Sequence, residues 1–61
     1  DEAGDKTFVV ALYEFKAESD RELDLVKGDK IELLEILDSS WMEGRLNGKV
    51  GVFPVGYVTY C

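Results

Sequence analysis

Five residues spread along this chain have the chemistry of a shallow peptide-binding surface: Tyr13, Phe15, Trp41, Pro54 and Tyr57. Flat rings offer apolar area, while Tyr hydroxyls and the Trp indole N–H can donate hydrogen bonds. A polyproline II helix exposes its carbonyls because it has no internal hydrogen bonds, and its fixed φ angles limit the entropy lost on binding. If the fold brings the five residues together, they predict a groove for proline-rich peptide.

An acidic stretch lies between the first two aromatic residues and Trp41, and it contains Glu18, Asp20 and Glu22. Negative charge beside flat aromatic rings favours a ligand that carries Arg or Lys. Arg is favoured because its guanidinium can bind a carboxylate through two hydrogen bonds and stack on an indole ring. The alternative is that the stretch is solvated surface.

The net charge of −6 bears on which partner is possible. A basic peptide is the electrostatically natural partner of such a domain. Nucleic acids and anionic membrane surfaces are disfavoured, because both are bound largely through Lys and Arg. The charge therefore agrees with a basic ligand, and from so small and open a site we expect micromolar affinity.

Catalysis and metal binding find little support in this composition. The chain has no histidine, and its single cysteine, Cys61, is the last residue. No serine has a base partner of the usual kind, and the alternating acids lack the glycine and closing glutamate of a calcium-binding EF-hand loop. We expect no catalytic residue, no metal site and no cofactor. One thiol makes no internal disulfide, which favours a reducing, cytoplasmic location.

The elements that must position the aromatic residues are short strands. A chain of 61 residues is one domain with a small core. We expect a disordered lead-in over residues 1–7 and a single domain over 8–61. Alternation and β-branched residues predict strands, which cover residues 8–13, 30–37, 41–46, 49–53 and 58–60. Residues 32–35 would also suit a helix, but strand is preferred because the neighbouring turns are closely spaced.

Several residues predict how these strands are joined. Asn47-Gly48 predicts a tight hairpin with φ > 0 at both positions. Gly44, in mid-strand, predicts the close passage of another backbone or a bulky side chain. Leu23 and Leu25 alternate with acids, so both should point under the domain from a long folded-back loop.

The chain should therefore be all-β, either a small barrel or a pair of packed antiparallel sheets. Pro54 should end its strand and begin a single tight turn that reaches Tyr57. The expected core is apolar and strand-borne, and its members are Val9, Ala11, Leu23, Leu25, Ile31, Leu33, Phe53 and Val58. Met42 is expected to pack rather than bind.

Four sequence motifs in this order and spacing resemble the Src homology 3 (SH3) domain family over residues 8–60. They are Ala-Leu-Tyr-Glu-Phe at 11–15, Leu23 and Leu25 followed by Gly28-Asp29 after the acidic stretch, Trp41 with Gly44, and Gly-Val-Phe-Pro-Val-Gly-Tyr-Val at 51–58. The resemblance implies a five-stranded, partly open barrel with one short 3-10 turn near Pro54–Tyr57. It also implies a non-catalytic, monomeric module of a larger cytoplasmic scaffold or signalling protein.

The resemblance further implies that Tyr13, Phe15, Trp41, Pro54 and Tyr57 line the groove for a Pro-x-x-Pro ligand, with Glu22 and Asp20 beside Trp41. An Arg or Lys of the ligand would then occupy a pocket there, with Glu22 the first choice of partner, Asp20 the second and Glu18 the third. Two positions depart from the family pattern. Phe15 replaces a tyrosine, and Gly56 stands where many members have an asparagine that binds a ligand carbonyl. The alternative function is therefore a module for a folded or atypical partner without Pro-x-x-Pro. The orientation of the ligand stays open.

Overall fold

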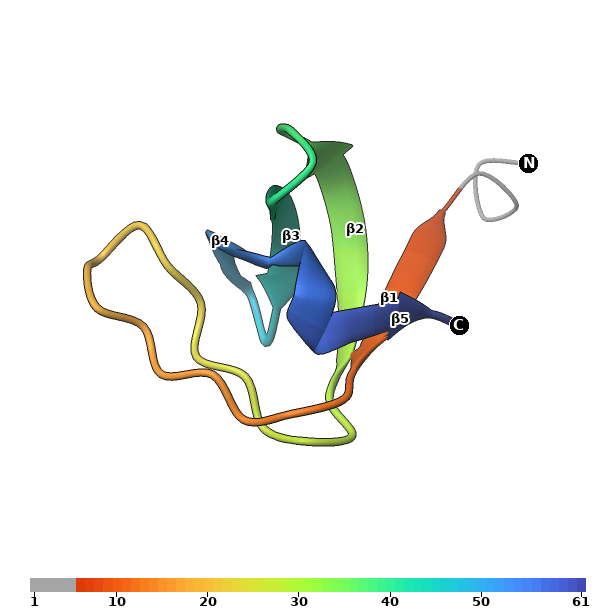
Figure 1. The fold of residues 1–61 in the computed structure, drawn as a ribbon, viewed down its shortest axis with the longest axis horizontal. Coiled ribbons are helices and arrows are strands. Elements are labelled where there is room, and N and C mark those ends of the chain that lie inside the picture. The colour runs from red at the N-terminus through yellow and green to blue at the C-terminus, as the bar shows by residue number, and fades with distance from the viewer. Residues whose placement is uncertain (1–5) are drawn as a thin grey trace.

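The computed structural model describes residues 6–61 and is all-β, as predicted (Figure 1). Its elements are β1 (Thr7–Ala11), β2 (Lys30–Ile36), β3 (Trp41–Leu46), β4 (Lys49–Pro54), a 3-10 turn (Val55–Tyr57) and β5 (Val58–Tyr60). The predicted lead-in over 1–7 falls mainly on residues 1–5, which lie outside the described residues, whereas Thr7 already belongs to β1. Within residues 6–61, no helix has the length and apolar character that crossing a membrane requires.

The C-terminal ends of three strands differ from the prediction, and β2 stops at Ile36, one residue earlier than predicted. β1 ends at Ala11 and not at residue 13, because the chain leaves the sheet there and the Leu12 N–H donates to the Tyr57 carbonyl at 2.7 Å. β4 continues through Pro54, whose φ of −71° and ψ of 138° are those of extended backbone. Proline has no N–H to donate to the sheet, and it is tolerated here because Pro54 is the last residue of the strand.

The five strands form one antiparallel sheet in the order β4-β3-β2-β1-β5. Of the two arrangements predicted from the sequence, a small barrel or a pair of packed sheets, hydrogen bonding therefore favours the first, with all five strands in one sheet. Figure 1 shows β2 as a long curved strand between β3 and β1. Its register shifts between Leu33 and Glu35, and such a bulge bends and twists a strand. The bend lets the sheet close over a single core.

The core consists of seven buried side chains: Val9, Ala11, Leu23, Leu25, Ile31, Met42 and Phe53. Leu23 and Leu25 come from the long loop (residues 12–29) that joins β1 to β2, as the alternation predicted. Leu33 and Val58 were predicted to be core but are only partly buried against it. The cross-strand neighbours of Leu33 are Thr7 and Gly44, which are too small to cover it, and Val58 lies on an edge strand.

Two glycine predictions are confirmed. Asn47 and Gly48 have φ of 55° and 83°, so the β3–β4 hairpin turn has positive φ at both positions. At Gly44, an added Cβ would lie 2.8 Å from the Glu32 carbonyl oxygen and 2.9 Å from the Phe53 ring. The absence of a side chain at Gly44 therefore allows β2 and the Phe53 ring to lie close to β3.

One like-charge pair gives a testable prediction about stability. Glu35 of β2 lies directly opposite Glu43 of β3, and like charges in that position are destabilising. We expect Glu35→Lys to raise the free energy of unfolding by about 0.5 kcal/mol, measured by urea denaturation. The control is Glu32→Lys on the same strand, because Glu32 Oε1 lies 3.3 Å from Arg45 Nη1. That change should destabilise, and equal effects of the two changes would contradict the argument.

Candidate functional site

The fold brings four aromatic side chains into one cluster. The Tyr13 and Tyr57 ring centroids are 5.9 Å apart at 82°. Phe15 lies 5.6 Å from Tyr57 and 6.3 Å from Trp41, also edge to face. Pro54 is the cross-strand partner of Trp41. All five residues singled out in the sequence therefore join one surface, hereafter the aromatic cluster, in which Phe15 and Tyr57 each contact two other rings.

Backbone hydrogen bonds connect three segments of chain at the cluster. Phe15 and Leu25 exchange two bonds of 3.0 and 2.8 Å, which anchor Phe15 beside a buried core leucine. The Leu12–Tyr57 bond fixes the start of the long loop to the 3-10 turn. The cluster is consequently part of the folded sheet and not a set of mobile surface groups.

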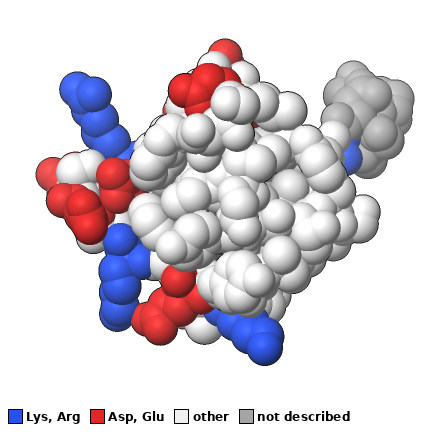
Figure 2. All heavy atoms as spheres, in the orientation of Figure 1, with Lys and Arg blue, Asp and Glu red and all other residues white. Residues whose placement is uncertain are grey.

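The rings of the aromatic cluster are unusually accessible for their size. Tyr13 is 60% exposed and Tyr57 38%, while Phe15, Trp41 and Pro54 are half-buried. Figure 2 shows a broad uncharged area over the 3-10 turn, with acidic atoms gathered over the long loop and above the β2–β3 loop. Contiguous apolar area rimmed by charge is typical of an interaction surface.

Glu22 is the most firmly held of the three predicted acidic residues. Its Oε1 accepts a hydrogen bond from the Glu18 N–H at 2.8 Å, and its backbone bridges Val52 of β4 in parallel. Glu22 thus lies along the edge of β4 that faces away from β3, beside Val52, two residues before Pro54, the cross-strand partner of Trp41. Glu18 and Asp20 are exposed near the tip of the loop. Of the predicted carboxylates, only Glu22 is both half-buried and fixed beside the sheet.

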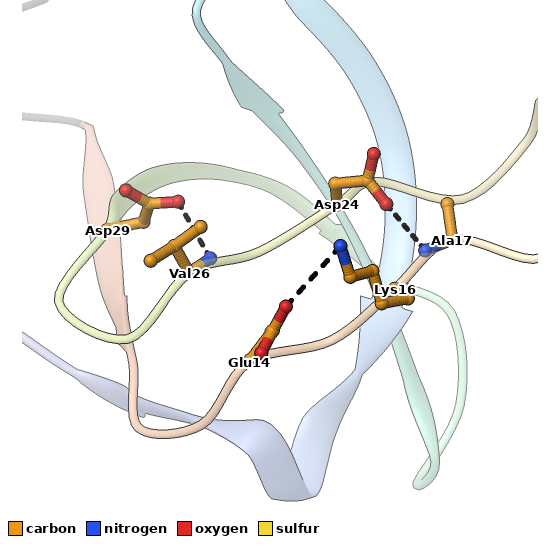
Figure 3. A network of polar contacts seen from close by, with 6 residues as sticks. All are labelled: Glu14, Lys16, Ala17, Asp24, Val26 and Asp29. Carbon is orange, nitrogen blue, oxygen red and sulfur yellow. Dashed lines mark hydrogen bonds and ion pairs between the residues drawn. The ribbon is translucent and has the colours of Figure 1, made fainter.

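The remaining acids of the long loop have structural contacts. Figure 3 shows Asp24, on the returning arm, pointing toward Ala17 on the outgoing arm, whose N–H donates to Asp24 Oδ1 at 2.6 Å. Asp29 Oδ2 accepts from the Val26 N–H at 2.9 Å. The Glu14–Lys16 ion pair, at 3.5 Å, joins strongly exposed side chains and contributes little. Side chain to backbone bonds thus give the loop its shape.

A cavity of about 300 Å³ lies elsewhere, lined by Leu23, Asp24, Leu46, Asn47 and Lys49. It includes no member of the aromatic cluster, which is an open surface suited to an extended ligand and not to an enclosed small molecule. Across residues 6–61, no three His, Cys, Asp or Glu side chains are grouped closely enough to hold a metal ion.

Sequence reasoning missed one residue next to the site. Asp38 was expected only to be part of a loop, but its Oδ1 accepts hydrogen bonds from the N–H groups of Ser40 and Trp41, each at 2.8 Å. The signal was available, since Asp side chains commonly bind backbone N–H groups two or three residues further on.

Comparison with known proteins agrees with this architecture. A family model described as SH3 domain matches residues 10–55. The chain is 49% identical over 55 residues to dynamin-binding protein of Rattus norvegicus and 45% identical over 56 residues to LAS seventeen-binding protein 1 of Saccharomyces cerevisiae. These matches cover 90% and 92% of this chain, but only 4% and 23% of the relatives.

Solved structures give the same answer. The yeast Pin3 SH3 domain superposes with a TM-score of 0.83 at 46% identity, covering 85% of this chain and 93% of that one. The C-terminal SH3 domain of myosin IB from Entamoeba histolytica, bound to a peptide, gives 0.86 at 41% identity and covers 92% and 93%. The chain therefore belongs to the SH3 domain family, whose members are non-catalytic modules of protein–protein interaction.

Proposed function

We propose that this domain binds proline-rich segments of other proteins in the polyproline II conformation. The observation that carries the proposal is the aromatic cluster, in which Phe15 contacts both Trp41 and Tyr57 while the rings stay accessible. A ligand with fixed φ angles and exposed carbonyls matches such a surface, because the rings supply apolar area and their polar atoms can donate hydrogen bonds.

The two prolines of a Pro-x-x-Pro ligand would occupy neighbouring slots. Tyr13 and Tyr57 form the walls of one slot, since their rings stand nearly perpendicular at 82°. Tyr57, Pro54 and Trp41 form the next, and Phe15 supplies its floor through edge-to-face contacts with two of these residues. Phe15 lacks a hydroxyl, but a half-buried ring packed against the core fills this role by its apolar face.

The basic residue of the ligand would bind next to Trp41. Glu22 is the favoured partner because it is already held beside β4, so little entropy is lost when it binds a cation. Asp20 and Glu18 would add long-range attraction from the loop tip. This arrangement favours Arg over Lys, since Arg can also stack on the indole ring.

Replacing Glu22 by glutamine tests this pocket. The amide keeps the acceptor for the Glu18 N–H but removes the charge, so we expect the affinity for an Arg-containing peptide to fall about threefold to tenfold. Isothermal titration calorimetry measures the change. A peptide with citrulline in place of Arg is the control, and it should bind the variant and the unaltered domain equally. A loss of the same size with citrulline would argue against a charge pair.

The alternative is a folded or atypical partner that uses the same surface. Gly56 favours it, because it is exposed with open space around its Cα and has no side chain to bind a ligand carbonyl. The relative dynamin-binding protein is named for the partner that it binds. This chain spans only 4% of that protein's length.

We infer a monomeric module of a larger cytoplasmic scaffold or signalling protein. Any link to the cytoskeleton or a membrane would be made by the parent protein.

Titration of the isotope-labelled domain with Arg-x-x-Pro-x-x-Pro and Pro-x-x-Pro-x-Arg peptides tests the proposal. Amide shifts should cluster at Tyr13, Glu22, Trp41 and Tyr57 and saturate at micromolar to sub-millimolar peptide. The peptide with the larger effect identifies the preferred orientation. An unchanged spectrum with both peptides would reject proline-rich recognition and favour the alternative partner.

A further inference from the structure

The loop between β2 and β3 closes around the backbone of Trp41. Asp38 Oδ1 accepts both the Ser40 N–H and the Trp41 N–H at 2.8 Å. In the opposite direction, the Trp41 carbonyl accepts from the N–H groups of Leu37, at 3.0 Å, and Asp38, at 3.3 Å. Both polar backbone groups of Trp41 are therefore bound by the two residues that follow β2.

These bonds matter because Trp41 is the first residue of β3. Its cross-strand partner in β4 is Pro54. A strand residue normally finds a backbone carbonyl as the acceptor for its N–H, but here a carboxylate oxygen of Asp38 takes that place. The direction in which the indole leaves the sheet follows from the backbone of Trp41, to which Asp38 is bound.

The loop between β2 and β3 is also hydrogen-bonded to the segment that carries Tyr57, which forms the other side of the second slot. The Ser40 carbonyl accepts a hydrogen bond from the Val55 N–H at 2.8 Å. Val55 begins the 3-10 turn that carries Tyr57. The turn formed by Asp38 thus links the segment before Trp41 to the segment before Tyr57.

We propose that Asp38 is a positioning residue for the aromatic cluster: its carboxylate oxygen fixes the backbone of Ser40 and Trp41, and thereby the width of the slot between Trp41 and Tyr57. The inference rests on the proposed peptide-binding function. What Asp38 contributes is an acceptor oxygen and not its charge.

The test compares Asp38→Ala with Asp38→Asn in the 61-residue chain. Alanine removes the acceptor, whereas the asparagine amide oxygen can still accept both N–H groups without the charge. We expect Asp38→Ala to weaken the preferred Pro-x-x-Pro peptide about threefold to tenfold, because the backbone of Ser40 and Trp41 must then be ordered when the peptide binds. Asp38→Asn should bind like the unaltered domain, and the urea midpoint should change little in either variant, because the loop is exposed.

Hydrogen exchange in the peptide-free domain supplies a second readout. The Ser40 and Trp41 amides should exchange faster in Asp38→Ala and at the original rate in Asp38→Asn. Two controls accompany them. Ser39→Ala alters the same loop, and Asp29→Ala removes a comparable bond, to the Val26 N–H at 2.9 Å, in another turn. Both controls should keep peptide affinity and the exchange rates of these two amides.

The outcomes separate the two ideas. Equal weakening by Ala and Asn would mean that the charge attracts the ligand, which overturns the positioning role. Unchanged affinity and exchange in Asp38→Ala would overturn it as well. If the unaltered domain binds neither peptide, the proposed function fails, yet faster exchange of Trp41 in the Ala variant alone would still establish that Asp38 holds its backbone.

Discussion

Replacing Trp41 by alanine should lower the affinity for proline-rich peptide about 30-fold or more while the domain stays folded. In the proposed site, Trp41 forms one wall of the second slot and the stacking face for a ligand Arg, so one truncation would remove both contacts. Its ring is half-buried and contacts Phe15 at the surface, outside the seven-residue core. Calorimetry measures the affinity, and circular dichroism during urea denaturation measures the stability.

Tyr60→Ala is the matched control, because Tyr60 is another exposed aromatic residue, 57% accessible, on edge strand β5 and outside the cluster. It should bind peptide like the unaltered domain. If Trp41→Ala retains binding, or if Tyr60→Ala loses as much, the groove lies elsewhere on the barrel.

A single methyl group at Gly44 should destabilise the whole domain. In Gly44→Ala the new carbon would lie 2.8 Å from both the Glu32 carbonyl oxygen and Ile31 Cγ2, and 2.9 Å from the Phe53 ring. Two of these neighbours are buried core side chains and the third is sheet backbone, so none can move away cheaply. We expect a loss of about 2 kcal/mol in the free energy of unfolding and a fall in Tm of about 10 °C.

Gly56→Ala is the control for this prediction, since an added Cβ at Gly56 meets nothing within 4 Å. It should unfold at the original denaturant concentration or slightly above, because alanine restricts the unfolded chain more than glycine does. An unchanged denaturation midpoint for Gly44→Ala would contradict the prediction. It would mean that β2 and β3 can move apart at that point without a loss of stability.

The position of Gly44 also explains how the site is built. Gly44 pairs across the sheet with Gly51. An added Cβ at Gly51 would lie 3.0 Å from the Arg21 carbonyl oxygen and 3.1 Å from the Leu23 nitrogen. Two facing glycines therefore let core side chains pack over β3 while the returning arm of the long loop lies close to β4. That close approach fixes Glu22 beside the sheet.

The sequence by itself determined the strand class, the hairpin and most of the core. Alternation put Leu23 and Leu25 inside, Asn47-Gly48 gave the turn its positive φ angles, and Gly44 marked a close approach. These features are readable because each depends on a residue and its near neighbours in the chain. The family motifs then indicated which aromatic residues would meet.

Only the tertiary structure decided how those residues are held. It brought Phe15 and Tyr57 each into contact with two other rings, bound Glu22 to the Glu18 backbone, and bound Asp38 to the backbone of Trp41. It also left Leu33 partly uncovered, because Thr7 and Gly44 are its neighbours across the sheet. Each of these facts depends on register and on hydrogen bonds whose partners are chosen when the sheet closes, and local sequence patterns carry no information about that choice.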